Sequence, residues 1–368
     1  MSGIVTEVWS TFSTSQLLTK WEKLHPNMEV NDTCLNINPQ LEKYYLPTMY
    51  GMEFILGLVG NLSVIWGYIF CLKEWKCSNI YLFNLSITDL TFICTLPMLV
   101  VYYGKGNKWT FGQVMCVLNR YILHINMYTS ILFLSCISFD RYLLVMSPLK
   151  LHFFQKKWNA IVICVGIWIF VTLELVPIFI FIEADHINTT SNKSLLLCLD
   201  YASSGNASDN LIYSMYLTVF GFFLPLCIML FFYIQTARGL KKIQQQRTKI
   251  QVEKPLTLII LAIVIFLMFF TPYHIMRNVR IASRMENNSM SECAKLTVKA
   301  LYAISRPIAF LNSITNPIFY FMLGDRFREQ FFNKLKTIFL RNSETTYQKE
   351  DSTTKPTGLN TGSEEIIL

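Results

Sequence analysis

Long, uninterrupted runs of apolar residues organise this sequence. Seven of them reach the roughly 20 residues that a helix needs to cross a bilayer, and they span residues 49–72, 80–103, 114–145, 158–182, 212–234, 256–280 and 301–323. The runs are continuous rather than alternating, which indicates helices that satisfy their own backbones in lipid and not the strands of a barrel. We therefore predict an all-α membrane protein, a seven-transmembrane helix bundle that occupies residues 48–323.

The segments outside these runs complete the predicted organisation. Residues 1–47 are polar and are expected to form an extracellular N-terminal segment. Residues 324–341 alternate Arg and Lys with Phe and Ile, which is typical of an amphipathic helix that lies on the membrane surface and contacts lipid. Residues 342–368 are rich in Ser and Thr and predict a disordered cytoplasmic tail.

Basic residues decide the predicted orientation. The loop at 235–254 carries six Lys and Arg residues, whereas the loop at 183–210 carries only Lys193. Positive-inside bias then places the C-terminus in the cytoplasm and the N-terminus outside, and we expect a multi-pass protein of the plasma membrane. The net charge is +8, but it lies in short loops and reflects topology rather than binding to nucleic acid. The glycosylation sequons in the predicted outer segments are Asn31, Asn188, Asn192, Asn206 and Asn287.

Polar groups within the spans form an inner set, and ionisable groups at such depth are usually functional. The set follows one order along the seven helices: Gly60-Asn61, Asp89, Asp140-Arg141-Tyr142, Trp168, Pro225 with Tyr233, Pro272, and Asn316-Pro317 with Tyr320. In these motifs the chain resembles the rhodopsin-like G-protein-coupled receptors.

That resemblance implies two inner sites. The first is an activation switch formed by Asp140, Arg141, Tyr142, Asn316, Pro317, Tyr320, Phe266, Phe270 and Pro272. The second is a cage for an allosteric sodium ion, formed by Asp89, Ser130, Asn312 and Asn316; no cofactor is expected otherwise. Phe270 departs from the family, which usually has Trp there, so Phe266 and Phe270 are expected to replace the rotating indole. The alternative is that these groups are only polar glue between helices.

A second set of polar residues lies in the outer halves of the helices and is mostly cationic. Arg120 and His124 are four residues apart and share a helix face, as do His274 and Arg277, with Tyr273 beside them. Arg306 follows in the last span. Cations without matching carboxylates in the membrane predict an anionic ligand, since a guanidinium group suits a carboxylate or phosphate. The alternatives are snorkelling of the long side chains to the interface and ordinary hydrogen-bonded packing of the two histidines.

Around this cluster the resemblance narrows to the branch of the family that responds to succinate. It rests on residues 41–46, 78–86, 119–121, 201–205 and 270–284. The resemblance implies a small dicarboxylate agonist, bound by Arg120, His124, Arg277 and Arg306 with Tyr273 and His274, closed in by Tyr50 and Tyr103, with Asp200 as a loop carboxylate. It also implies signalling to a heterotrimeric G protein, chiefly of the inhibitory class, and makes the Ser/Thr-rich tail a candidate site for arrestin.

The ten cysteines are scattered without a metal-binding spacing. The family resemblance implies a disulfide between Cys116 and Cys198. Cys34 and Cys293 are the other two cysteines placed outside, and we expect them to form a second disulfide, which an extracellular compartment permits.

Three other functions compete with a succinate receptor. An oxoglutarate or nucleotide receptor shares the pattern of His274, Arg277 and Arg306. A dicarboxylate carrier, from a different class, would need inverted repeats and broken helices, and neither is visible. An enzyme would need a nucleophile with its base or a metal triad, and we find neither, so we predict a protein that is not an enzyme.

Overall fold

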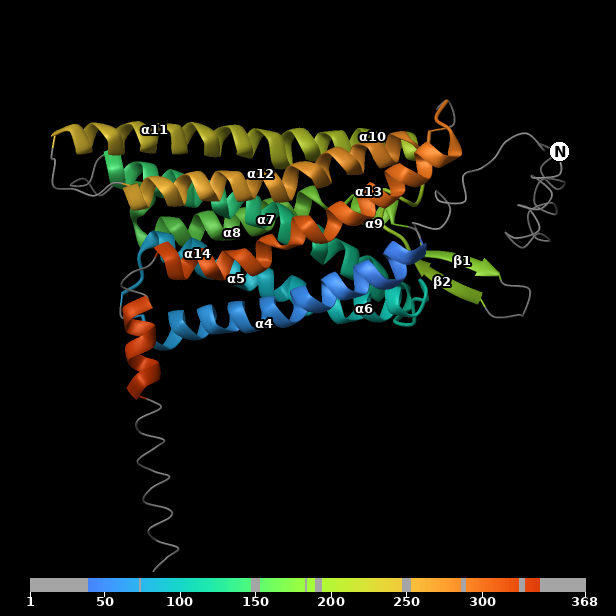
Figure 1. The fold of residues 1–368 in the computed structure, drawn as a ribbon, viewed down its shortest axis with the longest axis horizontal. Helices are drawn as coiled ribbons and strands as arrows, with labels where there is room; N and C mark the ends of the chain where they lie inside the picture. Colours follow the sequence, from blue (N-terminus) through green and yellow to red (C-terminus); the bar gives the residue numbers. More distant parts are fainter. Residues whose placement is uncertain are drawn as a thin grey trace, which may run out of the picture.

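The computed structural model describes residues 39–72, 74–146, 153–182, 184–188, 194–246, 253–285, 289–323 and 328–337. Its long helices lie side by side along one direction and form a bundle (Figure 1). The first six crossings are η1 and α4 (Leu41–Tyr45, Leu46–Phe70), α5 and α6 (Cys77–Ile93, Leu96–Gly104), α7 (Gly112–Met146), α8 and α9 (Lys157–Glu174, Ile178–Phe181), α10, η3 and α11 (Ala207–Tyr216, Leu217–Phe223, Leu224–Gln246), and α12 (Glu253–Ala282). All six are long and apolar enough to span a membrane.

The seventh crossing consists of α13 (Glu292–Phe310) and α14 (Asn312–Leu323), separated only by Leu311. It is not among the six apolar spans, and α13 carries the charged residues Glu292, Lys295, Lys299 and Arg306. It nevertheless packs in the bundle against α12 and α4. Of these four charged residues, Lys299 and Arg306 lie inside the bundle, where they line a cavity, whereas Glu292 and Lys295 form an exposed pair at the start of α13.

The outside of the bundle is apolar, and its interior combines an apolar core with buried polar groups. Its outer surface exposes large apolar side chains, including Ile55, Val59, Leu173 and Ile180, which suits contact with lipid. Its interior holds buried polar side chains, including Asp89 and Arg277. This distribution agrees with the all-α membrane fold predicted from the apolar runs.

One outer loop adds a hairpin that the apolar runs did not predict. Strands β1 (Ala184–Asn188) and β2 (Ser194–Cys198) pair antiparallel, with Ala184 opposite Cys198. A disulfide joins Cys198 to Cys116 near the start of α7, which confirms the expected pair. The bond and the hairpin hold this loop over one end of the bundle, where Figure 1 shows β1 and β2.

The remaining outer features lie partly outside the described residues. Cys293 takes part in a disulfide, whereas its expected partner, Cys34, is not among the described residues. Of the sequons, Asn206 is exposed and caps α10 by accepting a hydrogen bond from the Ser208 amide at 2.9 Å. Asn188 ends β1, and Asn31, Asn192 and Asn287 lie outside the described residues.

A short helix crosses the other end of the bundle. Residues 328–337 are helical and appear as the red segment set across the bundle axis (Figure 1). Phe331 is buried against Trp66 of α4, with ring centroids 5.6 Å apart, while Phe332 is exposed. This segment falls within the range predicted to be amphipathic, 324–341.

Candidate ligand pocket

A cavity of about 270 Å³ opens between the outer ends of the helices and the disulfide-bonded loop. Its wall comes from η1, α6, α7, α12 and α13 together with the loop after β2. The charged or hydrogen-bonding side chains that line it are Glu42, Tyr102, Tyr103, Asn107, Arg120, Asp200, Ser203, Arg280, Lys299, Tyr302 and Arg306.

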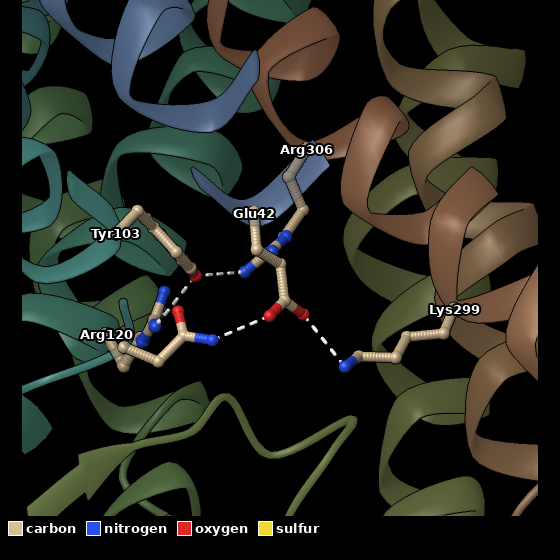
Figure 2. Close-up of polar contacts among 6 residues, drawn as sticks. Glu42, Tyr103, Arg120, Lys299 and Arg306 are labelled. Carbon is tan, nitrogen blue, oxygen red and sulfur yellow. Dashed lines mark hydrogen bonds and ion pairs between the residues drawn. The ribbon is translucent and has the colours of Figure 1, made fainter. Parts of the chain in front are cut away.

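Two arginines from different helices meet at one phenol in this cavity (Figure 2). Arg306 Nη1 lies 2.9 Å from the Tyr103 hydroxyl oxygen, and Arg120 Nη2 lies 3.3 Å from it. Arg120 also donates to the Cys198 carbonyl at 2.8 Å. The Nε atoms of both arginines are buried and have no hydrogen-bond partner among the described residues. A neutral oxygen thus serves two cations, which leaves both with unused donors for an anion.

Asp200, a loop carboxylate, lines the cavity with Arg120 and Arg306 but forms no ion pair with either. Its side chain accepts hydrogen bonds from the Tyr302 hydroxyl and from the Ala202 amide. Burial acts to raise its pKa, but nearby His124, Arg120 and Arg306 outweigh that effect and hold the pKa of Asp200 below its ordinary value. Among the described residues, no ion pair joins Asp200 to an arginine. Asp200 acts on the arginines through its field rather than by contact.

Arg277 is placed apart from the cavity that Arg120 and Arg306 line. Its guanidinium group donates to the Tyr128 hydroxyl at 2.6 Å, to Thr218 Oγ1 at 2.9 Å and to the Ser214 carbonyl at 3.1 Å. It is fully buried. The structure therefore divides the three predicted arginines into a pair in the cavity and a single residue held by α7, α10 and η3.

His124 connects the two parts. Its Nδ1 lies 2.7 Å from the Arg120 carbonyl, which can only accept, so Nδ1 carries the hydrogen; its Nε2 lies 3.3 Å from the Tyr273 hydroxyl oxygen. The Tyr273 ring lies under the Arg277 guanidinium group, 5.5 Å from centroid to Cζ. His274 instead stacks on Phe222 at 4.2 Å, and both of its ring nitrogens are buried without a partner in the described part of the chain.

Several cavity residues were not predicted from the sequence. Glu42 pairs with Lys299 at 2.8 Å and accepts from Asn107 at 2.6 Å. Arg280 lines the wall, and its buried Nε has no partner within the described ranges. Lys299 could have been found, because it lies seven residues before Arg306 and therefore on the same face of its helix.

Tyr50, which was expected to close the pocket, lies one layer behind the wall. Its ring contacts the Tyr103 ring, with centroids 6.0 Å apart, but it does not line the cavity. Tyr103 itself lines the cavity, as the family resemblance implied. Tyr50 is therefore placed to support Tyr103 rather than to meet a ligand.

The inner polar set surrounds Asp89 in the middle of the bundle. Asp89 Oδ1 accepts from Asn126 at 2.9 Å and from Ser313 at 2.8 Å, and its Oδ2 accepts from Asn316 at 2.8 Å. Asn126 and Ser313 were not among the predicted members. Ser130, which was, has a buried hydroxyl with no hydrogen-bond partner among the residues that the structure describes.

The proposed switch residues lie at the inner end and along α12. The opposite charges of the adjacent residues Asp140 and Arg141 suggest an ion pair, but none joins them among the described residues, and Asp140 hydrogen-bonds to Gln155 instead. Phe266 and Phe270 are buried with centroids 4.8 Å apart. The remaining predicted members of the switch are placed as follows: Tyr142 against Phe232, Pro272 within α12, and Asn316, Pro317 and Tyr320 within α14. Asn312, which was predicted for the sodium cage, begins α14.

Comparison with known proteins agrees with this architecture. The family described as "7 transmembrane receptor (rhodopsin family)" matches residues 60–320. Succinate receptor 1 of Rattus norvegicus is 54% identical over 81% of this chain and 92% of its own length, and that of Mus musculus is 51% identical over the same shares. A purinoceptor of Homo sapiens is 37% identical over 78% of this chain and 76% of its own length. With the matching family motifs set on a helical bundle whose outer loop is held by the Cys116–Cys198 bond, the chain belongs to the rhodopsin family of seven-transmembrane receptors.

Proposed function

We propose that this chain is a plasma-membrane receptor that is activated by extracellular succinate, or by a closely similar dicarboxylate, and transmits that signal to a heterotrimeric G protein. The observation that carries the proposal is the pair of guanidinium groups that share the Tyr103 hydroxyl in the outer cavity. The identity to the two rodent succinate receptors supports it. Of the residues predicted to bind the ligand, Arg120, Arg306, Tyr103 and Asp200 line the cavity, whereas His124, Arg277, Tyr50, Tyr273 and His274 do not and would act from around it.

The two groups of residues would have different tasks. Arg120 and Arg306 would engage a carboxylate directly, because both line the cavity and both have unused donors toward the described residues. Arg277 and His124 would add positive potential and polar contacts from behind the cavity. Their neighbour Tyr273 connects them to the cavity residue Tyr302, with ring centroids 6.0 Å apart.

A nucleotide receptor is the second candidate, because a purinoceptor is also a relative. The volume of the cavity argues against it. Pockets for drug-sized ligands measure about 300–1,000 Å³, whereas this one measures about 270 Å³. A four-carbon dianion suits that space better than a base, a sugar and two or three phosphates.

The inner half would carry the response. Arg141 and the basic loop at 235–254 would contact the G protein, of the inhibitory class, while Asp140 and Tyr142 would take part in the activation switch. The Ser/Thr-rich tail would contact arrestin. Asp89, Asn316, Ser130 and Asn312 would hold a sodium ion. The buried Asp89 carboxylate fits that ion, and so does the buried Ser130 hydroxyl, which has no hydrogen-bond partner among the described residues.

The exposed Asn206 supports a cavity that opens outside the cell. It belongs to a glycosylation sequon, and its side chain caps α10 at the end of the loop that covers the cavity. A sugar at this position would mark the cavity end of the bundle as extracellular.

The test is a ligand panel applied to cells that express the full chain. Succinate, oxoglutarate, butyrate and nucleotides are compared by nucleotide exchange on a G protein, and uptake of labelled succinate is measured in parallel. We expect succinate to act at the lowest concentration and uptake to stay at background. Activation by a nucleotide at lower concentration, equal potency of butyrate, or uptake without nucleotide exchange would each overturn the proposal.

A further inference from the structure

Glu42 closes the outer side of the cavity by joining three separate parts of the chain. Its carboxylate pairs with Lys299 of α13 at 2.8 Å and accepts from Asn107, in the loop after α6, at 2.6 Å. The Glu42 side chain is only 19% exposed and lines the cavity with both partners. Figure 2 shows it beside Arg306, with Lys299 reaching it from the far side.

The charges of the cavity wall are unequal in number. Among the described residues, the cationic side chains that line it are Arg120, Arg280, Lys299 and Arg306, and the carboxylates are Glu42 and Asp200. Two positive charges therefore remain, which a ligand with two negative charges balances. Without Glu42 the wall would carry three, which is the charge that a trianion balances.

We propose that Glu42 is a specificity-determining residue that limits the receptor to ligands with two negative charges. This role rests on the proposed function, which does not specify how many negative charges the site accepts. Glu42 repels each further negative charge that enters the cavity, and its ion pair with Lys299 keeps that carboxylate at the mouth. Asp200 would also repel a third negative charge, but it accepts a hydrogen bond from Tyr302 and so also has a structural role.

The expected size of the effect follows from Coulomb's law. One unit charge acting on another across roughly 7–10 Å, at the effective dielectric constant of about 20 that suits protein sites, changes an affinity by on the order of tenfold or more. Glu42→Gln should therefore favour a trianion over a dianion by about tenfold relative to the wild type. Gln has nearly the same size as Glu and keeps one acceptor oxygen, which can serve Lys299 or Asn107 but not both at the two oxygens they now use.

The experiment compares small carboxylates that differ in charge. Butyrate, succinate and propane-1,2,3-tricarboxylate are titrated on cells expressing the full chain, with nucleotide exchange as the readout and surface expression as normalisation. The variants are Glu42→Gln, Lys299→Gln and the double variant. The control is Glu292→Gln, which removes the carboxylate of a similar ion pair, with Lys295 at 2.9 Å, that is exposed and does not line the cavity.

We expect the ratio of tricarboxylate to succinate potency to rise in Glu42→Gln, to fall in Lys299→Gln, and to return to the wild-type value in the double variant. Glu292→Gln should leave the ratio unchanged. If Glu42→Gln shifts all three ligands equally, Glu42 is only a steric lid and the inference is wrong. An unchanged ratio also overturns it, while the proposed function stands. A wild-type receptor that ignores succinate would overturn both.

Discussion

The polar groups around Asp89 and those around Tyr103 lie in the same bundle but are balanced in opposite ways. Around Asp89, one buried carboxylate accepts hydrogen bonds from three neutral side chains and faces no cation among the described residues. Around Tyr103, two guanidinium groups donate to one neutral oxygen, and no carboxylate in the described ranges lies within ion-pair distance of them. The inner group thus retains negative charge and the outer group retains positive charge.

This difference indicates what each site would take from outside the chain. Isolated charge in a region without water is costly unless it is paired. The inner site therefore suits a small cation and the outer site a small anion. Substitutions that change one site should leave the other largely intact, and the following predictions use that independence.

Arg306→Ala should have the largest effect on the response to the ligand. It removes a charged donor from the cavity, and a charged hydrogen bond contributes about 1.5–3 kcal/mol, so succinate potency should fall by roughly 10- to 150-fold. Thermal stability of the purified receptor should change little, because the hydrogen bond that is lost joins Arg306 to Tyr103, which keeps Arg120 as a donor. Lys295→Ala, at a position outside the cavity, is the control. Potency within about threefold of wild type would exclude Arg306 from the site.

Arg277→Ala should separate direct binding from support of the wall. It leaves the Tyr128 hydroxyl without its donor, whereas Thr218 still accepts from Asn278 and the Ser214 carbonyl still accepts from Thr218. Loss of the buried donor should cost about 1–3 kcal/mol of stability. We expect a lower thermal midpoint together with weaker ligand response, whereas Arg306→Ala affects the response alone. A large loss of potency at unchanged thermal midpoint would instead place Arg277 in direct contact with the ligand.

Asp89→Asn addresses the inner site. An asparagine amide replaces one carboxylate oxygen by a donor, so at least one of Asn126, Ser313 and Asn316 would face another donor. We expect a loss of about 1–2 kcal/mol in stability, with succinate affinity unchanged within about threefold. The measurement is thermal unfolding with and without sodium, and any stabilisation by sodium should disappear in the variant. A shift in succinate affinity as large as that of Arg306→Ala would show that the two sites are not independent.

The fold was largely predictable because a membrane imposes a simple rule. Runs of about 20 apolar residues must become helices, and six of the crossings satisfy that rule by composition alone. Helical periodicity predicted that Arg120 and His124 share one face of their helix, but only the assembled bundle brings Arg120 and Arg306 to the same hydroxyl. The hairpin of β1 and β2 was missed, since it lies in a loop where no apolar periodicity operates.

The parts of the site that were missed depend on contacts between distant segments. Arg277 is drawn away from the cavity by oxygens of Tyr128, Ser214 and Thr218, and no local pattern predicts such a group. Glu42 lies ahead of the apolar run, so its pairing with Lys299 appears only once the helices are assembled. The adjacent opposite charges of Asp140 and Arg141 suggested an ion pair, but Asp140 hydrogen-bonds to Gln155, in a segment that follows the helix.

The pH dependence of Asp200 is the smallest expected effect. His124, Arg120 and Arg306 hold its pKa below the ordinary value despite burial. A lowered pKa in the folded state means that the ionised carboxylate stabilises the fold above the unfolded pKa of about 3.9, and that this contribution is lost only as pH falls through the still lower folded pKa. Asp200→Asn should therefore change the thermal midpoint by the same amount at a pH of about 7.4 as at a pH of about 5.5, since both lie above that window. Acidification should lower succinate potency to the same extent in the wild type and in Asp200→Asn, because Asp200 takes up no proton in this pH range. If the difference in midpoint between the two proteins disappears at the lower pH, Asp200 titrates there, and the surrounding cations do not lower its pKa as the cavity geometry requires.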